Sequence, residues 1–86
     1  MAGEADEVRV YWRPGCPFCY ALRLGLRLRR LPLPLRETNI WEDASAAGRV
    51  REITGGDETV PTVVVGSTTM VNPRPGAVVA AARSAC

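Results

Sequence analysis

Two cysteines, Cys16 and Cys19, are separated by a Pro-Phe pair at the point where a leucine-rich helical pattern begins. If Cys16 caps the helix, Pro17 takes the first helical position, where a missing N–H costs nothing, and Cys19 follows one turn later. The free N–H groups of the first turn and the positive end of the helix dipole then favour a thiolate at Cys16. The spacing predicts a dithiol redox site, with Cys16 as nucleophile and Cys19 as the thiol that resolves its mixed disulfide.

Three other roles compete for this cysteine pair. A structural disulfide between residues three apart would close almost no loop. A zinc site needs two further ligands, and the chain has no histidine and only one more cysteine, the terminal Cys86, to which we assign no role. We therefore expect no bound metal, and an iron–sulfur cluster bridged between two chains stays open as an alternative.

The composition limits the classes of protein that the chain can form. Its 86 residues suffice for one small domain, over residues 1–86. With 23% charged residues and a net charge of +2, nucleic acid is not an expected partner. No stretch approaches the length of a membrane span, and residues 1–7 are acidic and lack the pattern of a secretory signal. We expect a cytoplasmic monomer with a flexible tail at residues 1–7 and no membrane partner.

The elements that must position the cysteines begin with a strand over residues 8–12, in which apolar and polar side chains alternate. A helix is expected from Pro17 to about Leu31. Its helical wheel has two apolar sides, and we expect the arginine stripe between them to be solvated. One side comprises Ala21, Leu24, Leu28 and Leu31, the other comprises Leu22 and Leu26, and the stripe comprises Arg23, Arg27 and Arg30.

The middle of the chain predicts a strand and a second helix. Two prolines end the first helix and introduce an edge-like strand over residues 33–40. The second helix, over about residues 43–53, is expected to be stopped by a glycine pair. Trp41 is expected to cap the edge of the core. The residues of this helix expected to be buried are Ala44, Ala47, Val50 and Ile53.

The last third of the chain predicts a hairpin and a final helix. A β-branched run over residues 59–65 is followed by Gly66-Ser67 and a second run over 68–71, which is typical of a hairpin with a type II′ turn. Asn72-Pro73 has the form of a helix cap followed by a proline and predicts a helix from this point. The predicted order of elements is β-α-β-α-β-β-α.

A first loop that reads Cys-Pro-Phe-Cys, with a later strand entered through Thr59-Val60-Pro61, resembles the glutaredoxin branch of the thioredoxin-like superfamily. The resemblance implies an α/β fold with a four-stranded mixed sheet flanked by three helices. It implies a thiol–disulfide oxidoreductase whose catalytic residues are Cys16 and Cys19. It also implies that Pro61 is cis and faces the cysteines, and that the Val60 backbone offers hydrogen bonds to the amide of a bound thiol.

One departure from the family concerns the thiol that is used. Glutathione-using glutaredoxins carry Gly-Gly and an aspartate near the last turn, whereas residues 71–75 here read Val-Asn-Pro-Arg-Pro. This segment, preceded by Gly-Gly-Asp-Glu-Thr-Val-Pro, looks like the mycoredoxins of actinobacteria. The resemblance implies mycothiol as co-substrate in preference to glutathione, no bound cofactor, and client proteins or small molecules that carry mycothiol mixed disulfides.

Further side chains near the cysteines are candidate substrate-binding residues. Phe18 and Tyr20 could pack on a bound thiol, although Tyr20 could equally belong to the core. Arg13 could attract the polar end of the thiol or an acidic client group. Thr59 and Asn72 complete the set, although a strand threonine and a helix cap explain these two residues as well.

Two alternatives to a mycoredoxin-like function stay open. One is an NrdH-like redoxin that donates electrons to ribonucleotide reductase and is recharged by thioredoxin reductase. Such redoxins usually carry a Trp-Ser-Gly-Phe-Arg-Pro type segment before the last helix, which residues 69–74 do not match. The other is a non-enzymatic carrier of a [2Fe–2S] cluster, against which the stiff Pro17 argues. Whether Cys19 acts in the cycle also stays open.

Overall fold

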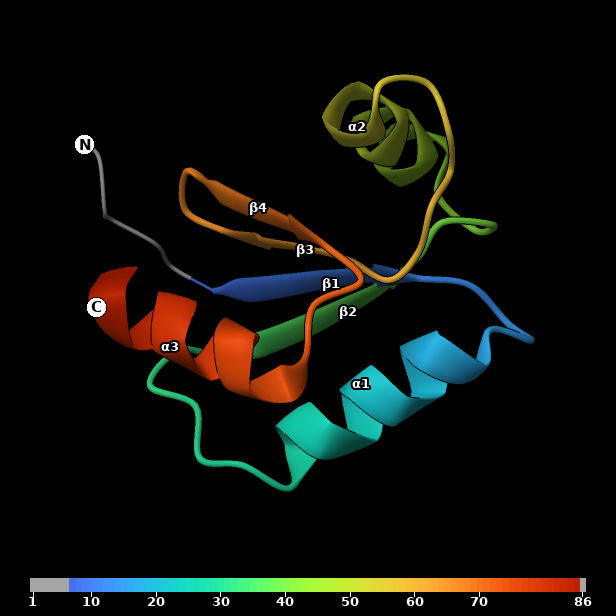
Figure 1. The fold of residues 1–86 in the computed structure, drawn as a ribbon. Coiled ribbons are helices and arrows are strands. Elements are labelled where there is room, and N and C mark those ends of the chain that lie inside the picture. The colour runs from blue at the N-terminus through green and yellow to red at the C-terminus, as the bar shows by residue number, and fades with distance from the viewer. Residues whose placement is uncertain (1–6, 86) are drawn as a thin grey trace.

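A computed structural model describes residues 7–85, and it confirms the predicted order of elements (Figure 1). The expected tail, apart from Glu7, and Cys86 lie outside the described residues. Glu7 is ion-paired with Arg9 and Arg36, so the last residue of that tail is not free. The elements are β1 (Val8–Trp12), α1 (Pro17–Arg27), β2 (Leu35–Asn39), α2 (Ala44–Thr54), β3 (Thr62–Val65), β4 (Thr68–Val71) and α3 (Pro75–Ala85).

The strands form one mixed sheet in the order β2-β1-β3-β4. β1 pairs with β2 in parallel, whereas β1 with β3 and β3 with β4 are antiparallel. The predicted edge strand is therefore confirmed as β2, which begins at Leu35 because Pro32 and Pro34 before it cannot donate to a ladder. β1 leads into the cysteine loop, and β3 follows the Val60-Pro61 peptide. The sheet order places these two strands side by side at the centre.

Helices cover both faces of the sheet (Figure 1). α1 and α3 lie on one face, where Val8 and Val10 of β1 pack against Leu22, Leu26 and Val78. α2 lies on the other face, over a smaller apolar cluster. That cluster comprises Tyr11, Ile40, Ala46, Ala47 and Val50. Because successive residues of β1 point to opposite faces, this one strand contributes to both layers.

The predicted extent of the first helix is too long, and of its two predicted apolar sides only the one with Leu22 and Leu26 is confirmed. α1 ends at Arg27 and is buried through Cys19, Leu22 and Leu26. The expected face with Ala21 is exposed, and Leu24 and Leu28 are 59% and 77% exposed. α1 rests on the sheet through one stripe at spacings of three and four residues, so its opposite side faces solvent.

The arginine stripe of α1 is only partly solvated, which also differs from the prediction. Arg23 and Arg27 both pair with Glu37 of β2, and the Arg23 guanidinium stacks 3.7 Å from the centre of the Trp12 ring. Burial would raise the pKa of the Glu37 carboxyl, but the hydrogen bonds from Arg27 and Arg23 outweigh it and the pKa lies below its ordinary value. This cluster ties α1 to the edge strand.

The second helix has the predicted ends. Asp43 caps α2 by accepting a hydrogen bond from the Ala46 N–H at 3.1 Å, and Gly55 ends it with a φ of +86°. Its buried residues include Ala46, whereas the predicted Ala44 is exposed. Trp41 is 64% exposed and does not cap the core, because the turn after β2 carries its ring outward toward the cysteine loop.

The hairpin is confirmed, since Gly66 has a φ of +60° and Ser67 does not have a positive φ, as a type II′ turn requires. Within residues 7–85, no helix is long and apolar enough to cross a membrane.

Candidate active site

Cys16 lies at the N-cap of α1, as the spacing predicted. Its backbone is extended, with φ −97° and ψ 105°, and Pro17 takes the first helical position. The Cys16 Sγ accepts a hydrogen bond from the Cys19 N–H at 3.2 Å. A hydrogen bond from an N–H group of the first turn stabilises negative charge on the sulfur. Both sulfurs are free thiols in this structure.

Burial separates the two cysteines. Cys16 retains 4% of its surface and Cys19 none. The pKa of Cys19 is raised to about 12, first by burial and then by the hydrogen bond and the charge of Cys16, while Arg13 opposes the shift. Cys19 therefore stays protonated at neutral pH, and Cys16 is the sulfur that a disulfide can reach.

The entry to β3 lies against the cysteines. The Val60-Pro61 peptide is cis, which confirms the expectation for Pro61, and the Cys16 thiol donates a long hydrogen bond to the Val60 carbonyl oxygen at 3.8 Å. The buried Thr62 hydroxyl donates to the Thr59 carbonyl at 2.7 Å and fixes this turn. The side chain of Thr59 points to solvent, so its observed contribution is through its backbone.

The segment before α3 forms the second wall of the site. Asn72 does not cap the helix as predicted. It adopts a left-handed conformation with φ +51°, and its N–H donates to the Pro61 carbonyl at 2.7 Å. The helix begins at Pro75, and the Arg74 carbonyl accepts its first bonds. The hydrogen bond from Asn72 to the Pro61 carbonyl, just before β3, thus keeps the chain out of helical conformation until Pro75.

A hollow of about 400 Å³ lies between this segment and the start of α1. Phe18, which is 64% exposed, and Asn72 both line it, so the structure brings two of the predicted binding residues together. Sequence analysis missed Arg74 and Pro75 as part of this wall, although two prolines around an arginine just before a helix are a signal of a fixed turn. The full lining comprises Phe18, Ala21, Leu22, Asn72, Pro73, Arg74 and Pro75.

Arg13 lies on the cysteine loop and Tyr20 at the start of α1, both away from this hollow. Tyr20 is 46% exposed, so the alternative that it belongs to the core is wrong. Its hydroxyl accepts a hydrogen bond from the Gly15 N–H at 2.8 Å. Tyr20 therefore braces the loop. The Arg13 guanidinium lies 5.8 Å from the centre of the exposed Trp41 ring. Neither residue lines the hollow beside Phe18.

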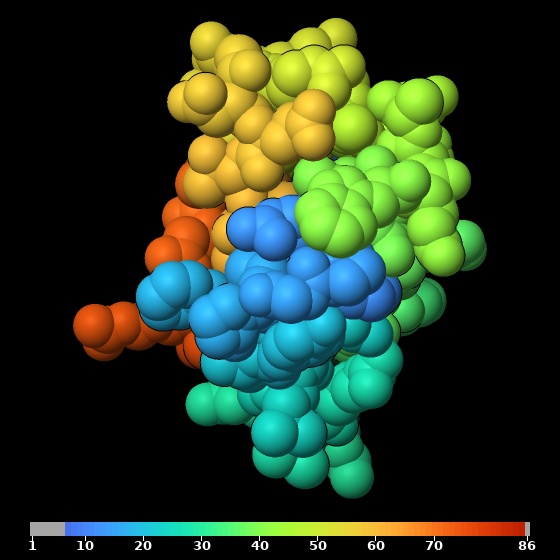
Figure 2. Space-filling model, turned by 90° about the vertical axis from the view of Figure 1, so that its right-hand side faces the viewer, coloured from blue at the N-terminus to red at the C-terminus, as the bar shows by residue number. Residues whose placement is uncertain are grey.

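The face that carries the loop is seen directly in Figure 2. The loop and the start of α1 (blue) occupy its middle, with the segment after β2 (light green) on one side. The segment before α3 (orange-red) projects on the other side. Within the described residues there is no group of three or more His, Cys, Asp or Glu side chains placed to hold a metal ion.

The sheet order, the helix layers and a cysteine pair at the start of α1 define a thioredoxin-like fold with a dithiol motif. A family model described as Glutaredoxin matches residues 8–70, and the chain belongs to the glutaredoxin family. It is therefore a glutaredoxin-like redox protein. No curated protein sequence matches the chain.

Solved structures share this fold. The glutaredoxin-like protein NrdH-redoxin from Escherichia coli has a TM-score of 0.68 at 22% identity, over 84% of this chain and 90% of that chain. The thioredoxin-like protein BC3987 has a TM-score of 0.63 at 25% identity, over 74% and 84%. Glutaredoxin from Brucella melitensis has a TM-score of 0.59 at 22% identity, over 83% and 74%.

Proposed function

We propose that the protein is a mycoredoxin-type thiol–disulfide oxidoreductase that reduces mycothiol mixed disulfides on proteins or small molecules. The observation that supports the reaction is the geometry of Cys16, whose sulfur accepts the Cys19 N–H at the start of α1 and keeps a narrow opening to solvent. We place this activity in the cytoplasm, in a monomer that holds no bound cofactor.

The proposed cycle needs one nucleophile. The Cys16 thiolate attacks the mycothiol sulfur of a mixed disulfide, the old S–S bond breaks, and the client leaves as a thiolate that takes a proton from water. Cys16 then carries mycothiol. A second mycothiol thiolate attacks the bound mycothiol sulfur, forms mycothiol disulfide and releases the Cys16 thiolate. In one cycle the client cysteine is reduced to a thiol. The mycothiol that it carried and one free mycothiol end as mycothiol disulfide.

Cys19 can enter only through a second branch. In this branch its thiolate attacks Cys16 Sγ, forms the Cys16–Cys19 disulfide and releases mycothiol. The pKa of about 12 belongs to the state in which Cys16 is free, whereas this step begins only after Cys16 has formed the mixed disulfide. Once Cys16 is in a mixed disulfide, its charge is gone and burial is the main remaining obstacle. We therefore propose the monothiol route as the main cycle.

The wall before α3 supports mycothiol over glutathione. Glutathione has a charged γ-glutamyl end that carries both an ammonium and a carboxylate. Arg74 is the one charged residue that lines the hollow, and no lining side chain is a carboxylate that could receive the ammonium. Burying a charge without a partner costs more than an ordinary hydrogen bond returns. Mycothiol is an uncharged sugar–inositol conjugate of acetylcysteine and needs only hydroxyl-friendly contacts and the backbone beside Val60.

The test is a coupled turnover assay of the oxidised protein with mycothiol, glutathione and thioredoxin reductase in parallel, with Cys16→Ser as the background. We expect mycothiol to exceed glutathione in kcat/KM by at least about tenfold, which corresponds to about 1.4 kcal/mol. Equal efficiency, or faster turnover with glutathione, would replace the proposal by an ordinary glutaredoxin.

The same assay separates the two alternatives. The NrdH-redoxin from Escherichia coli is described as having a thioredoxin-like activity profile. Efficient reduction by thioredoxin reductase, with no turnover by mycothiol, would assign the chain to that role. A brown, cluster-absorbing protein after anaerobic purification, inactive with all three reductants, would assign it to a [2Fe–2S] carrier.

A further inference from the structure

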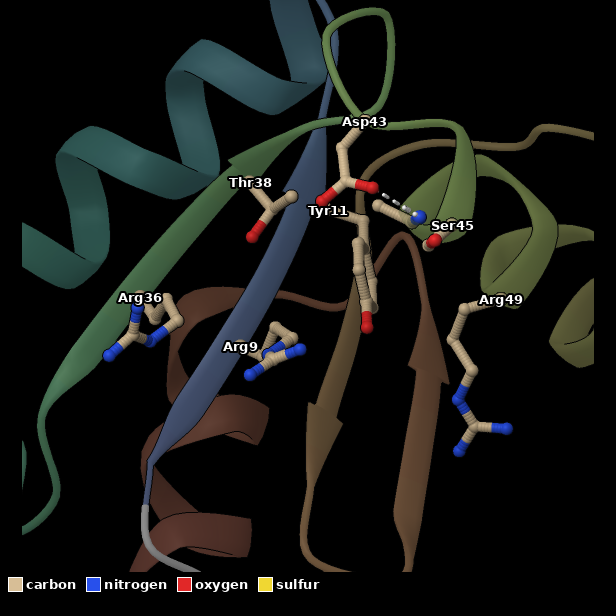
Figure 3. Close-up of a pocket in the computed structure, with 8 residues that line it drawn as sticks. Arg9, Tyr11, Arg36, Thr38, Asp43, Ser45 and Arg49 are labelled. Carbon is tan, nitrogen blue, oxygen red and sulfur yellow. Dashed lines mark hydrogen bonds between the residues drawn. The ribbon is translucent and has the colours of Figure 1, made fainter.

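A second cavity, of about 420 Å³, lies on the sheet face that α2 covers only at one end (Figures 1 and 3). It shares no lining residue with the hollow beside Phe18, and neither cysteine lines it. Its size falls within the range of small-molecule sites. The lining comprises Arg9, Tyr11, Arg36, Thr38, Asp43, Ser45, Ala46 and Arg49, which come from β1, β2 and the start of α2.

Two of its arginines are direct neighbours in the sheet. Arg9 and Arg36 are register partners on the parallel strands β1 and β2, and like charges placed opposite each other destabilise a sheet. Glu7 relieves this repulsion: its carboxylate accepts from the Arg9 Nε at 2.7 Å and from the Arg36 Nε at 2.9 Å. The pKa of Glu7 is lowered, first by its hydrogen bond to Arg9. The sheet therefore builds a place for an anion, and a carboxylate of the chain itself partly fills it.

Tyr11 gives the cavity a buried polar group. The residue is 4% exposed, and its ring packs in the apolar cluster under α2. Its hydroxyl lies beside the Arg9 guanidinium and raises the pKa of Arg9 through a hydrogen bond, after the larger effect of Glu7. Figure 3 shows this hydroxyl on the side of the cavity where the Arg9 and Arg49 guanidinium groups lie. Because a guanidinium can only donate, the Tyr11 oxygen accepts from Arg9 and its O–H stays available to donate to a ligand.

The balance of charge in the lining favours an anion. Asp43 contributes the one carboxylate, and that group caps α2 through the Ala46 N–H at 3.1 Å. It lies at the opposite end of the cavity from the three guanidinium groups (Figure 3). Arg49 has a loose exposed pair with Glu52 at 3.6 Å, and its guanidinium is otherwise available. Hydroxyls of Thr38 and Ser45 add further donors.

We propose that this cavity binds the phosphate groups of a small phosphorylated molecule. Arginine forks match phosphate oxygens in pairs of hydrogen bonds, and the three arginines come from three different elements. Each of the three guanidinium forks can pair with two oxygens, so together they suit two linked phosphates better than one. Glu7 is an internal competitor that the ligand displaces from Arg9 and Arg36. The site is independent of the redox chemistry at Cys16.

The test is a titration of the isotope-labelled, full-length protein, followed by NMR, with inorganic phosphate and with pyrophosphate in a low-salt, phosphate-free buffer. We expect saturable binding at one site with shifts of the amides around Arg9, Tyr11 and Ser45, and pyrophosphate binding about tenfold tighter than phosphate. Equal affinities for the two anions would assign the site to a single phosphate group and overturn the two-phosphate assignment. Shifts that rise linearly without saturation would show adventitious ions only and overturn the site.

Four variants locate the binding. Tyr11→Phe keeps the ring in its cluster and should weaken pyrophosphate binding about threefold, and Arg36→Gln about tenfold. Glu7→Gln should tighten binding, because it removes the competing carboxylate. Arg83→Gln makes the same charge change on the exposed end of α3, on the other layer, and should leave affinity unchanged. Equal weakening by Arg83→Gln and Arg36→Gln, or no effect of Tyr11→Phe, would overturn the site.

Discussion

The two helices that begin beside the cysteine site both have a proline as their first residue, but their first turns have different roles. α1 and α3 each begin with a proline, Pro17 and Pro75. At α1 the residue before the proline turns its side chain into the helix, so that the Cys16 sulfur receives an N–H of the first turn. At α3 the chain before the proline is tied by its backbone to the Pro61 carbonyl. The first start creates a reactive group, and the second shapes the wall that a bound thiol would meet.

The difference separates two sources of function. The hydrogen bond that favours a thiolate at Cys16 joins residues three apart, so it forms within one helical turn. The wall depends on residues that are far apart along the chain, and on the close packing of α3 against α1. We therefore expect changes at the first start to abolish the chemistry and changes at the second to alter its efficiency and selectivity.

The largest effect should come from Cys16→Ser. Removing the nucleophile should lower turnover of a mixed disulfide by at least about a thousandfold, because a serine hydroxyl does not exchange with disulfides at neutral pH. Cys19→Ser is the matched change and should retain monothiol transfer, with a mixed disulfide at Cys16 that is visible by mass. An active Cys16→Ser protein would show that the first helix start does not supply the nucleophile.

The second effect concerns the ionisation of Cys19. We expect its thiolate absorbance in the ultraviolet to appear only as the pH approaches 12, and Cys16→Ala to lower this pKa without returning it to the ordinary value near 9, since burial remains. The folded state holds this proton more tightly than the unfolded chain does. Its contribution to stability is therefore full below about pH 9 and is lost as the pH rises toward 12. Titration of Cys19 near 9 in the wild-type protein would contradict the burial argument.

The third effect tests how α1 holds the start of α3. A Cβ added at Gly25 would lie 2.6 Å from the Cγ of Pro75, a stiff ring that cannot turn away. Overpacking of this kind costs about 1–3 kcal/mol, and the better helix propensity of alanine returns up to about 1 kcal/mol. We expect Gly25→Ala to lower the free energy of unfolding by about 1–2 kcal/mol in denaturant titrations.

Gly48→Ala is the control for that change. It makes the same substitution inside α2, where the added Cβ would meet only the Arg51 side chain at 3.6 Å. This variant should be as stable as the wild type or up to about 1 kcal/mol more stable. If the two alanine variants unfold alike, the contact between Gly25 and Pro75 does not constrain the second helix start.

The same contrast explains how much of the site could be predicted from the sequence. Cys16 at the N-cap and the stop of α2 at Gly55 follow from bonds within one turn, and both predictions are confirmed. Asn72-Pro73 has the same local form as Cys16-Pro17, yet the prediction of a helix start there is wrong. The hydrogen bond from Asn72 to the Pro61 carbonyl prevents a helix start there, and a local sequence pattern cannot reveal a bond between distant residues.

Burial of the first helix shows the same limit. Leu22, Leu24, Leu26 and Leu28 alternate with polar residues, so the pattern gives two possible apolar faces. The side that rests on the sheet is the one with Leu22 and Leu26, and the other leucines are exposed. Likewise, the pairing of Arg9 with Arg36 follows from the parallel register of β1 and β2, which the sequence alone did not reveal.

A smaller effect is expected where the two helix starts meet. Phe18 is exposed and lines the hollow with Asn72. Phe18→Ala should lower kcat/KM for a mycothiol mixed disulfide about fivefold by removing apolar contact, with little change in stability. Leu24→Ala removes a similarly exposed side chain from the same helix outside the hollow and should be neutral. Equal kinetics for both variants would remove Phe18 from the binding surface.

The smallest effect is at Asn72, and it separates the backbone of the second helix start from its side chain. A φ of +51° is accessible to asparagine and glycine but costs alanine about 1 kcal/mol. Asn72→Ala should therefore reduce stability by about that amount, whereas Asn72→Gly should not.

If the side chain also contacts the bound thiol, both variants should raise KM for mycothiol about twofold to threefold, because both lose the amide. If only the backbone matters, Asn72→Gly should match the wild type in stability and in KM. Thermal unfolding and steady-state kinetics on the pair decide between the two, and a glycine variant less stable than the alanine variant would contradict the left-handed backbone at this position.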